Sequence, residues 1–542
     1  MTSVTADYTD IKTQPELDQW STFLRVCSLE NSRLSEIRRN ARRRLVQAAE
    51  QYVLRLQGIA EEADLPALKT PVFTSTSENT PIVMTGHQPV VFHSGLTFKY
   101  ETTQRFVGDN EAIGLAVIID TDQGDAGQFS FPHLQSAADA SPSAGPADGP
   151  AAGPVDGPVD GPTAGRPELA IETLAEPHRL YGHARMKSPA ELKAIGQSIS
   201  DELTRSGQTS AAERTQQTLT QFAQLSAAKA TMTQANTIMR RQHGIGDQLL
   251  ELPLSAIAAF PECLMLTADI LKQPLRFASG YNAALQAFRD EYNIRNTANP
   301  FPDLKVEEHS CELPFWIVDH DRGKRYVLEV QLDGNMTKLT ASGKTVDSFA
   351  GNITSETLEP MLLQNLQIIP RGALITAFLR LLFSDLFVHG TGGARYDRFT
   401  DELMRSWWNA EPPPFTVATA SRHLFSAQRT EIERLQQVKT DLRELQYNPQ
   451  RYFGQAVFSA ELEQQLVALM KEKQAAVDAM KSFHADGQSA KEAGSAIQHL
   501  TNAIKQAVVA EFEPQLQDLH SITGEQMDAI NCRTYPWFFF SR

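Results

Sequence analysis

The sequence has few cysteines and no recognisable zinc-binding motif. Its 542 residues contain four cysteines, Cys27, Cys263, Cys311 and Cys532. None of them forms a CxxC pair and no HExxH sequence occurs, so the common zinc signatures are absent. Four thiols spread over so long a chain do not make a disulfide scaffold, and we expect a reducing compartment. Cys263 and Cys311 lie in apolar surroundings, which indicates buried, unreactive thiols.

The sequence also lacks a long apolar run and an excess of positive charge. No apolar stretch approaches the roughly 20 residues that a membrane-spanning helix requires, and the first residues lack the basic and apolar pattern of a signal peptide. The formal net charge is −15, whereas binding to nucleic acid or to an anionic membrane requires a basic surface. We therefore expect a cytoplasmic protein that binds neither nucleic acid nor membranes.

Composition and periodicity divide the chain into segments. Residues 136–166 are rich in Gly, Pro, Ala and Asp and have little apolar surface to bury, which is typical of a disordered insertion. Residues 426–531 repeat apolar residues at spacings of three and four, which predicts a helical, coiled-coil-like arm; the same spacing also fits helices packed on the main core. The other expected segments are a helical N-terminal region over 1–75, two parts of an α/β core over 76–135 and 167–425, and an aromatic tail over 532–542 that packs in a groove of this chain or of a second subunit.

Residues 81–99 have the pattern of a ligand site. An apolar run stops at a glycine-containing turn, and a helical pattern then begins. Such units form ligand sites in open α/β sheets, because strand ends and helix N-termini converge there. The structural alternative is a capped turn with one buried, hydrogen-bonded histidine. The candidate residues for binding phosphate or stabilising negative charge are Gly86, His87, Gln88, His93 and Lys99.

A second group of polar residues follows a second apolar run. Residues 114–119 are followed by Asp120, Asp122 and Asp125. Carboxylates after a buried strand bind Mg²⁺, ribose hydroxyls or a substrate amine. The alternative is that they cap a helix and line a solvated loop. Because both strands end in polar loops, we expect one site at the carboxyl edge of a sheet, with Asp120 and Asp122 in it.

A third group lies about 300 residues later in the chain. Gly390, Gly392 and Gly393 follow His389 and leave backbone N–H groups accessible to an anion. No Gly-Lys-Ser/Thr follows them, so this is not a P-loop. The preceding apolar segment, residues 378–387, contains two charged side chains that must be paired or face a cleft. These are Arg380 and Asp385, and the alternative is that they form an internal ion pair with each other.

These segments together resemble the bacillithiol biosynthesis cysteine-adding enzyme family. Residues 85–88, Thr-Gly-His-Gln, resemble its Thr-Gly-Gln-Gln segment, and the strand ending at Asp120 lies where the family has a strand followed by Glu-Asp-His-Asp. Residues 369–393 are similar to its later Arg-Pro, Gln-Asp and Gly-Gly-Pro segments. The resemblance implies a Rossmann-like nucleotidyltransferase-type core, a long α-helical arm used in dimerisation, and joining of cysteine to a glucosaminyl-malate.

The residues and the resemblance together predict a ligase-like enzyme that joins an amino acid to an amino sugar or similar amine. His87, Asp120 and Asp122 would be catalytic, and Arg380 with the turn at 390–393 would bind a carboxylate or second anion. A nucleotide, ATP or ADP with Mg²⁺, is the expected cofactor, and a second copy of the chain is the expected partner. Two alternatives stay open: a nucleotidyltransferase-like enzyme of a sugar pathway, since residues 87–89 are similar to the His-Gln-Pro start of such a family, and a non-catalytic dimeric scaffold.

Overall fold

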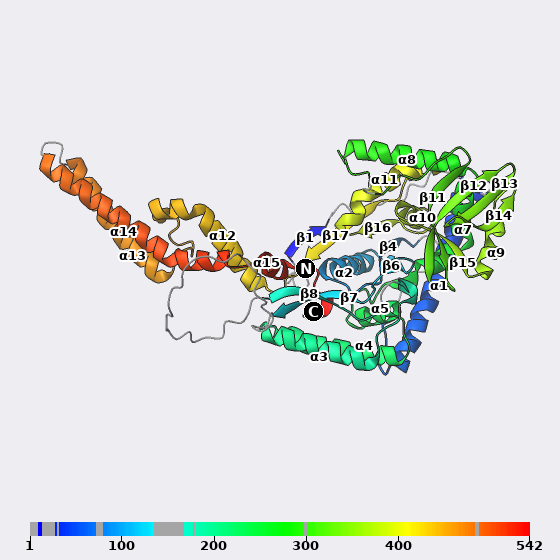
Figure 1. Cartoon of the computed structure of the whole chain (residues 1–542), viewed down its shortest axis with the longest axis horizontal. Coiled ribbons are helices and arrows are strands. Elements are labelled where there is room, and N and C mark those ends of the chain that lie inside the picture. The colour runs from blue at the N-terminus through cyan, green and yellow to red at the C-terminus, as the bar shows by residue number, and fades with distance from the viewer. Residues whose placement is uncertain are drawn as a thin grey trace, which may run out of the picture. The chain divides into compact units, whose positions relative to one another are not determined.

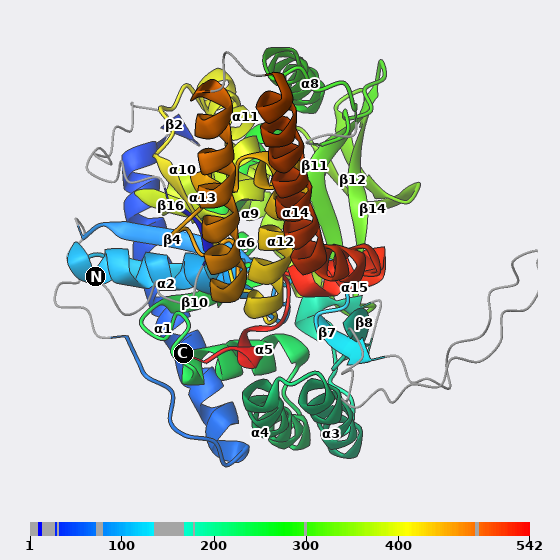
Figure 2. The same ribbon diagram turned by 90° about the vertical axis from the view of Figure 1, so that its left-hand side faces the viewer.

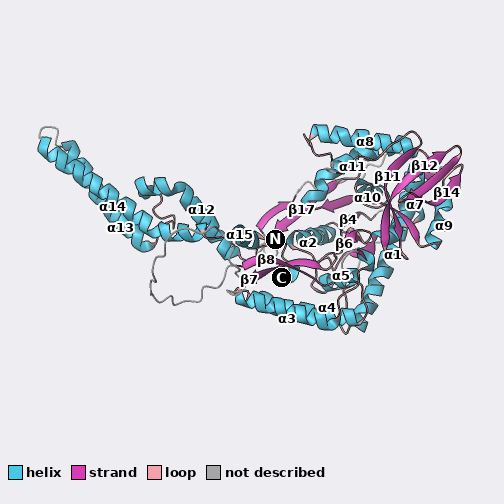
Figure 3. Ribbon diagram, viewed as in Figure 1, coloured by secondary structure: helices cyan, strands magenta, loops and turns pink. Residues whose placement is uncertain are grey.

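Figure 1 shows the computed structural model, which describes residues 9–13, 28–29, 32–71, 80–134, 167–176, 179–297, 301–482 and 487–541. The fold is mixed α/β, as predicted, and helices predominate (Figure 3). The chain divides into two compact units, one of residues 1–133, 170–422 and 533–542 and one of residues 134–169 and 423–532. The insertion predicted to be disordered, 136–166, lies outside the described residues.

The first unit contains a six-stranded sheet in the order β1-β17-β16-β4-β5-β10. Its strands are β1 (Thr9–Thr13), β4 (Ile82–His87), β5 (Ile113–Ile118), β10 (Leu250–Pro253), β16 (Leu386–His389) and β17 (Phe415–Ser421). All except β1 are parallel, and β5 is buried at every residue, as in sheets that are covered on both faces. Counted along the chain, the five parallel strands lie in the order 3-2-1-4-5, so the order reverses between β4 and β16.

Helices follow the two central strands of this sheet. α2 (Ser94–Asp109) follows β4, and α11 (Thr391–Trp408) follows β16, so both helices begin at the carboxyl edge. α10 (Ala373–Leu382) precedes β16, and α1 (Leu34–Glu62) packs against α10 and β10 through apolar residues spaced three and four apart. In open sheets of this kind, ligands bind beyond the carboxyl ends of the strands where the strand order reverses.

The described part of the chain between β5 and β10 contains short strands and three α-helices. The strands are β6 (Gln123–Gly124), β7 (Gln128–Leu134), β8 (Pro167–Thr173) and β9 (Arg179–Leu180). The helices are α3 (Pro189–Arg205), α4 (Thr209–Ala227) and α5 (Met232–Gln242). Ser188 and Thr231 begin α3 and α5 with capping boxes, in which the cap hydroxyl and the side chain three residues later satisfy backbone N–H groups reciprocally.

A second, antiparallel sheet follows in the order β14-β13-β12-β11-β15. Its elements are β11 (Ser310–Asp319), β12 (Lys324–Asp333), β13 (Met336–Ala341), β14 (Lys344–Ala350), α9 (Ser355–Leu363) and β15 (Leu366–Pro370). The sequence indicates a hairpin around residues 319–323, because β-rich segments flank a turn that contains glycine. The antiparallel pairing of β11 with β12 confirms that interpretation.

The helical prediction for the N-terminal region holds only in part. α1 begins at Leu34, whereas the described residues before it form β1 and a hairpin of β2 (Ser28–Leu29) and β3 (Ser32–Arg33). β1 pairs with β17 at the edge of the main sheet. Pairing with a strand more than 400 residues away is a tertiary effect, which local residue spacing does not reveal.

The second unit contains a group of helices. They are α12 (Ser426–Tyr447), α13 (Ala460–Ser482), α14 (Gly487–His520) and α15 (Gly524–Asn531). α14 packs against α12 and α13, as Figure 2 shows. Leu435 and Val438 of α12 and Ile504 and Val508 of α14 are buried, so each of these two helices has buried apolar residues three or four positions apart. α12 ends at Tyr447, two residues before Pro449.

The C-terminal segment belongs to the first unit. Tyr535, Trp537, Phe538 and Phe539 are buried there, so the aromatic tail packs within its own chain. Its backbone joins the loop before α2, since the Trp537 N–H donates to the Phe92 carbonyl at 2.8 Å. Among the described residues, no helix combines the length and apolar character that crossing a membrane requires.

Candidate functional site

A buried lysine lies at the end of β4. Lys99, on α2, is 3% exposed, and its ammonium donates to the Gly86 carbonyl at 2.7 Å. No carboxylate in the described part of the chain lies within ion-pair distance of it. Burial lowers the pKa of Lys99 to about 7, because the charged form loses its hydration. An ammonium without a counter-ion in the protein has the chemistry to bind an anionic ligand.

His87 ends the same strand and stays neutral. Burial, followed by the charge of Lys99, lowers the pKa of His87 to about 3. Nδ1 lies 3.1 Å from the Gln88 carbonyl, so in the neutral ring Nδ1 carries the proton and Nε2 is left as an acceptor. Gly86 lets β5 approach closely, since a Cβ there would lie 2.9 Å from the Val117 carbonyl oxygen.

His93 has a structural role, the helix-capping one that the sequence analysis gave as the alternative to ligand binding. It is the N-cap of α2, and its Nδ1 accepts the Gly95 N–H at 3.1 Å. Burial, followed by the charges of Arg533 and Lys99, lowers the pKa of His93 to about 4. The neutral ring is therefore an acceptor that holds the first turn of α2.

At the end of β16, a histidine is paired with a buried carboxylate. His389 Nε2 donates to Asp397 Oδ2 at 2.7 Å, and Arg380 Nη1 donates to the same oxygen at 2.9 Å. Arg380 also lies 2.7 Å from Asp401. Burial opposes ionisation of Asp397, but His389 and Arg380 together hold its pKa below the usual value. In the neutral ring, Nδ1 of His389 is then the nitrogen that can accept a proton.

α11 begins directly after His389 without a side-chain cap. Gly390 is the N-cap, and Gly392 has open space where a Cβ would lie. A Cβ on Gly393 would lie 2.6 Å from His389 Nδ1, so the glycine leaves room for the ring and Nδ1 faces this first turn. The N-terminal N–H groups of an uncapped helix, together with its dipole, favour an anion.

The sheet register brings these two strand ends together. Thr85 of β4 pairs with Val388 of β16, and its hydroxyl donates to the Val388 carbonyl at 2.9 Å. The next residues along the parallel pair are Gly86 and His389, on strands about 4.8 Å apart. Lys99, His87, His389 and the start of α11 therefore lie at one edge of the sheet, at the point where the strand order reverses.

Asp120 and Asp122 lie at the same edge but hold other parts of the protein. Asp120 accepts from the Ser255 N–H at 3.0 Å and from its hydroxyl, at the start of α6 (Leu254–Ala258). Burial raises the pKa of Asp120, against the effect of the Ser255 hydrogen bonds. Asp122 pairs with Arg325 and accepts from Gln88 Nε2 at 2.9 Å. Asp120 therefore has the helix-capping role that was the alternative to a catalytic one. Asp122 links the loop after β4, through Gln88, to the second sheet, through Arg325.

Several polar residues lie at this edge that the sequence did not predict to be there. Gln367 Nε2 donates to the Ser255 carbonyl at 3.1 Å, so its Oε1 accepts from His320 Nε2 at 2.6 Å. His320 Nδ1 then accepts from His183 Nε2 at 3.1 Å. Arg325 stacks on Trp316 at 4.3 Å. These partners come from distant loops and strands, and no spacing within one segment links them.

The prediction that Asp385 belongs to the site is wrong. Asp385 precedes β16, at the amino edge of the sheet, where it pairs with Arg38 at 2.7 Å and Arg42 at 2.9 Å and accepts from the Ile82 N–H. The alternative of an Arg380–Asp385 pair is wrong as well, because Arg380 pairs with Asp397 and Asp401. The reason is that α10 ends at Leu382 and a strand begins at Leu386, so the two residues do not share one helix.

This placement predicts a purely structural effect for Asp385→Ala. Removing one partner of a buried ion pair leaves the Arg38 charge uncompensated, so we expect a loss of about 3–5 kcal/mol in the free energy of unfolding. Urea unfolding at 25 °C measures this loss. Ligand affinity at the carboxyl edge should be unchanged in the folded variant; a parallel loss of affinity would place Asp385 in the site.

Among the residues that the structure describes, neither a metal site nor a reactive cysteine accompanies this edge. In the described part of the chain, no group of three or more His, Cys, Asp and Glu side chains is placed to hold a metal ion. Asp120 and Asp122 are already bonded to Ser255 and Arg325, so they do not fit the role of Mg²⁺ ligands. Cys263 and Cys311 are buried as predicted, and burial raises the pKa of Cys311 to about 12.

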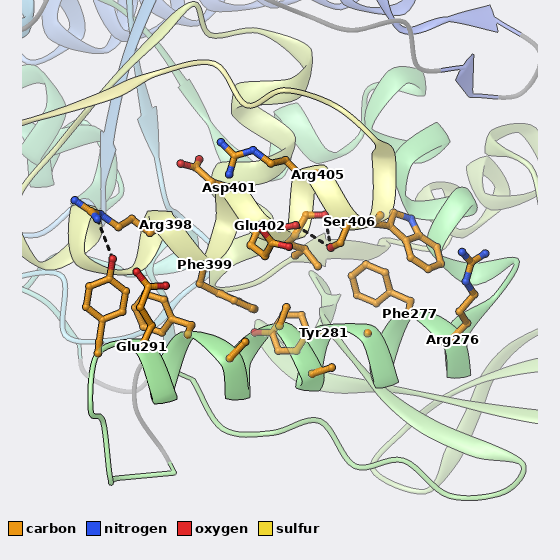
Figure 4. Close-up of a pocket in the computed structure, with 18 of the residues that line it drawn as sticks. Arg276, Phe277, Tyr281, Glu291, Arg398, Phe399, Asp401, Glu402, Arg405 and Ser406 are labelled. Carbon is orange, nitrogen blue, oxygen red and sulfur yellow. Dashed lines mark hydrogen bonds between the residues drawn. The ribbon is translucent and has the colours of Figure 1, made fainter.

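A separate cleft of about 890 Å³ lies between α8 (Pro274–Glu291) and α11 (Figure 4). Aromatic side chains from both helices line it, and Arg398 donates to the Tyr292 hydroxyl at one end. None of the sequence-predicted site residues lines this cleft. Its wall includes Phe415, whose ring lies 5.6 Å from the His389 ring, so a single side chain separates the cleft from the site.

No family model matches the sequence, and the comparison with curated proteins finds no match.

Proposed function

We propose that this protein is a cytoplasmic enzyme with a Rossmann-like nucleotidyltransferase-type core that binds the anionic group of a small molecule between β4 and β16. The strand order 3-2-1-4-5 supports the core assignment, since doubly wound dinucleotide-binding sheets have this order. The observation that carries the proposal is the Lys99 ammonium, buried at the strand-order reversal without a carboxylate partner.

The anionic group would lie between Lys99 and the first turn of α11. A phosphate or carboxylate there would accept from the Lys99 ammonium and from N–H groups of residues 391–393. Anion binding also stabilises the charged form of Lys99, so the amine takes up a proton when the ligand binds. A nucleotide fits this arrangement through its phosphates, and bound ATP would supply activation of a carboxylate.

The reaction we propose is C–N bond formation between an amino acid carboxyl group and an amine, as the resemblance to the cysteine-adding family implies. The amine nitrogen would bond to the carbon of a carboxyl group activated by ATP, while the bond from that carbon to the phosphate-bearing oxygen breaks and the phosphate-containing group leaves. His389 would accept the proton that the attacking amine loses, through Nδ1, while Asp397 orients the ring and stabilises its charged form. His87 Nε2 would accept a hydrogen bond from a substrate N–H or O–H. We further propose that the helices of the second unit form a coiled-coil-like arm through which two copies associate.

A ligand screen by thermal shift tests this function. ATP, ADP, cysteine and glucosamine derivatives are added singly and in pairs, because a ligand that binds only the folded state raises its stability by mass action. A rise in Tm with a nucleotide or an amino acid, followed by product formation from the pair, supports the proposal. If no anionic ligand raises Tm and no product forms, the non-catalytic scaffold becomes the better interpretation.

Two glycines of α11 provide a matched pair of variants. Gly392→Asp places a carboxylate in the first turn, where it stabilises the helix by about 0.3–1 kcal/mol but repels an anion, so we expect a higher Tm and loss of ligand binding. Gly393→Ala puts a methyl group 2.6 Å from His389 Nδ1, so we expect turnover to fall while anion affinity changes little. Calorimetry of each folded variant measures Tm and anion affinity, and an activity assay measures turnover. Undiminished anion binding in Gly392→Asp would contradict the assignment.

A further inference from the structure

A second, much smaller cavity lies beside the start of α2. Its volume is about 100 Å³, and it is enclosed by α2, α4 and the C-terminal segment. Trp537, Phe538, Phe540 and Ser541 form the wall that the C-terminal segment contributes. The cavity shares no residue with the Lys99 and His389 arrangement, so it is a separate site in the same unit.

Arg214 of α4 lines this cavity with an incomplete set of hydrogen bonds. Its Nη2 donates to the Phe539 carbonyl at 2.5 Å, whereas its Nε is buried and has no hydrogen-bond partner. No carboxylate in the described part of the chain makes an ion pair with it. A buried donor without an acceptor destabilises the folded protein, and a ligand oxygen would remove that cost.

The charges around the cavity favour an anion. Arg422 also lines it, and its Nη1 donates to the Ser541 carbonyl at 2.7 Å. Burial lowers the pKa of Arg214, Glu213 acts in the opposite direction, and the positive charge of Arg422 lowers it further, so the two guanidinium groups repel each other. Glu101 is the carboxylate in the lining, which leaves two positive side chains against one negative.

We infer that this cavity binds a single small oxyanion, of the size of phosphate or sulfate, between Arg214 and Arg422. The volume fits a small ligand: about 100 Å³ is the space of about three water molecules, which admits one tetrahedral oxyanion. A guanidinium presents paired N–H donors that match two oxygens of such an anion. The inference goes beyond the proposed reaction and does not depend on it.

The test uses the full-length protein labelled with 5-fluorotryptophan. Trp537 lines the cavity, and its ¹⁹F resonance is assigned by its absence in Trp537→Phe. Titration with sodium phosphate and sodium sulfate is expected to shift this resonance saturably, while sodium chloride at equal ionic strength does not. Arg214→Gln should weaken the apparent affinity by at least about tenfold, since a charge-assisted hydrogen bond is lost.

Three further variants make the result decisive. Gln217 is exposed, so Gln217→Glu should fold normally while placing a carboxylate at the cavity, and it should abolish the phosphate-induced shift. This variant tests the inference even if Arg214→Gln fails to fold. Arg105→Gln removes an exposed arginine from α2 and should bind phosphate normally. Lys99→Met, which acts at the other site, should also leave the shift unchanged. Equal shifts with chloride, or a full phosphate response in both Arg214→Gln and Gln217→Glu, would overturn the inference.

Discussion

Replacing Lys99 with methionine is expected to reduce turnover by at least about a hundredfold, which is the usual cost of removing a group that stabilises developing negative charge. The methionine fills nearly the same volume, so the first turns of α2 should keep their packing. What is lost is the ammonium that donates to the Gly86 carbonyl and, in our account, to the ligand. The same variant should lose anion affinity in a calorimetric titration.

The same substitution should leave the fold intact or make it more stable at neutral pH. The pKa of Lys99 is about 7 in the folded protein and near 10.5 when unfolded, so between these values the unfolded chain binds more protons. Stability should therefore rise with pH across this window, by up to about 1.4 kcal/mol per pH unit. Lys99→Met removes this contribution.

Urea unfolding of the wild type and of Lys99→Met at pH 7, 8.5 and 10 measures the difference in slope. Lys193→Met, an exposed lysine of α3, is the control and should keep the slope of the wild type. A Lys99→Met variant that unfolds readily yet binds the anion normally would show that Lys99 is structural only.

Asp397→Asn is expected to affect both stability and turnover. The amide cannot balance the buried charge of Arg380, so we expect a loss of about 3 kcal/mol, the lower end of the range for breaking a buried ion pair because Asp401 still contacts Arg380. Without the carboxylate, His389 loses the partner that fixes its tautomer, and turnover should fall by about 10³–10⁴-fold, as in other histidine–aspartate pairs. His389→Gln should match the loss in turnover with a smaller loss in stability.

The stability difference between wild type and Asp397→Asn should depend on pH in a defined direction. The pKa of Asp397 is depressed in the folded state, so its stabilising effect is present above the unfolded value of 3.8 and is lost as pH falls through the folded value. Unfolding curves from pH 7 down to pH 3 measure this, with Asp109→Asn, an exposed acid at the end of α2, as the control. An equal difference at pH 7 and pH 3 would contradict the pairing.

The sequence predicted the edge of the sheet at which these candidate residues lie because of a simple geometric rule. His87, Asp120 and His389 each follow an apolar run, and the carboxyl ends of parallel strands meet at one edge, so residues 300 apart converge. Their individual contacts could not be predicted in the same way. The partner of Asp120 is Ser255, and that of Asp122 is Arg325, each from a segment whose position depends on the whole fold.

The wrong assignment of Asp385 has a local cause. Residues 378–387 form a largely apolar segment with no glycine or proline, and such a segment fits a buried helix and a buried strand equally well. The chain changes from helix to strand within three residues, and this change moves Asp385 to the opposite edge of the sheet from His389. Only pairing with β4, which is a long-range contact, decides between the two structures.

Reductive labelling with pyridoxal 5′-phosphate tests most directly whether Lys99 and the start of α11 form an anion site. The aldehyde forms an imine with a neutral amine, borohydride fixes it, and peptide mass spectrometry locates it. We predict that Lys99 is labelled preferentially near pH 7, that pyridoxal without the phosphate labels it far less, and that Gly392→Asp suppresses the labelling. A Lys99 that stays unlabelled while exposed lysines react, or that reacts equally with both aldehydes, would contradict the account.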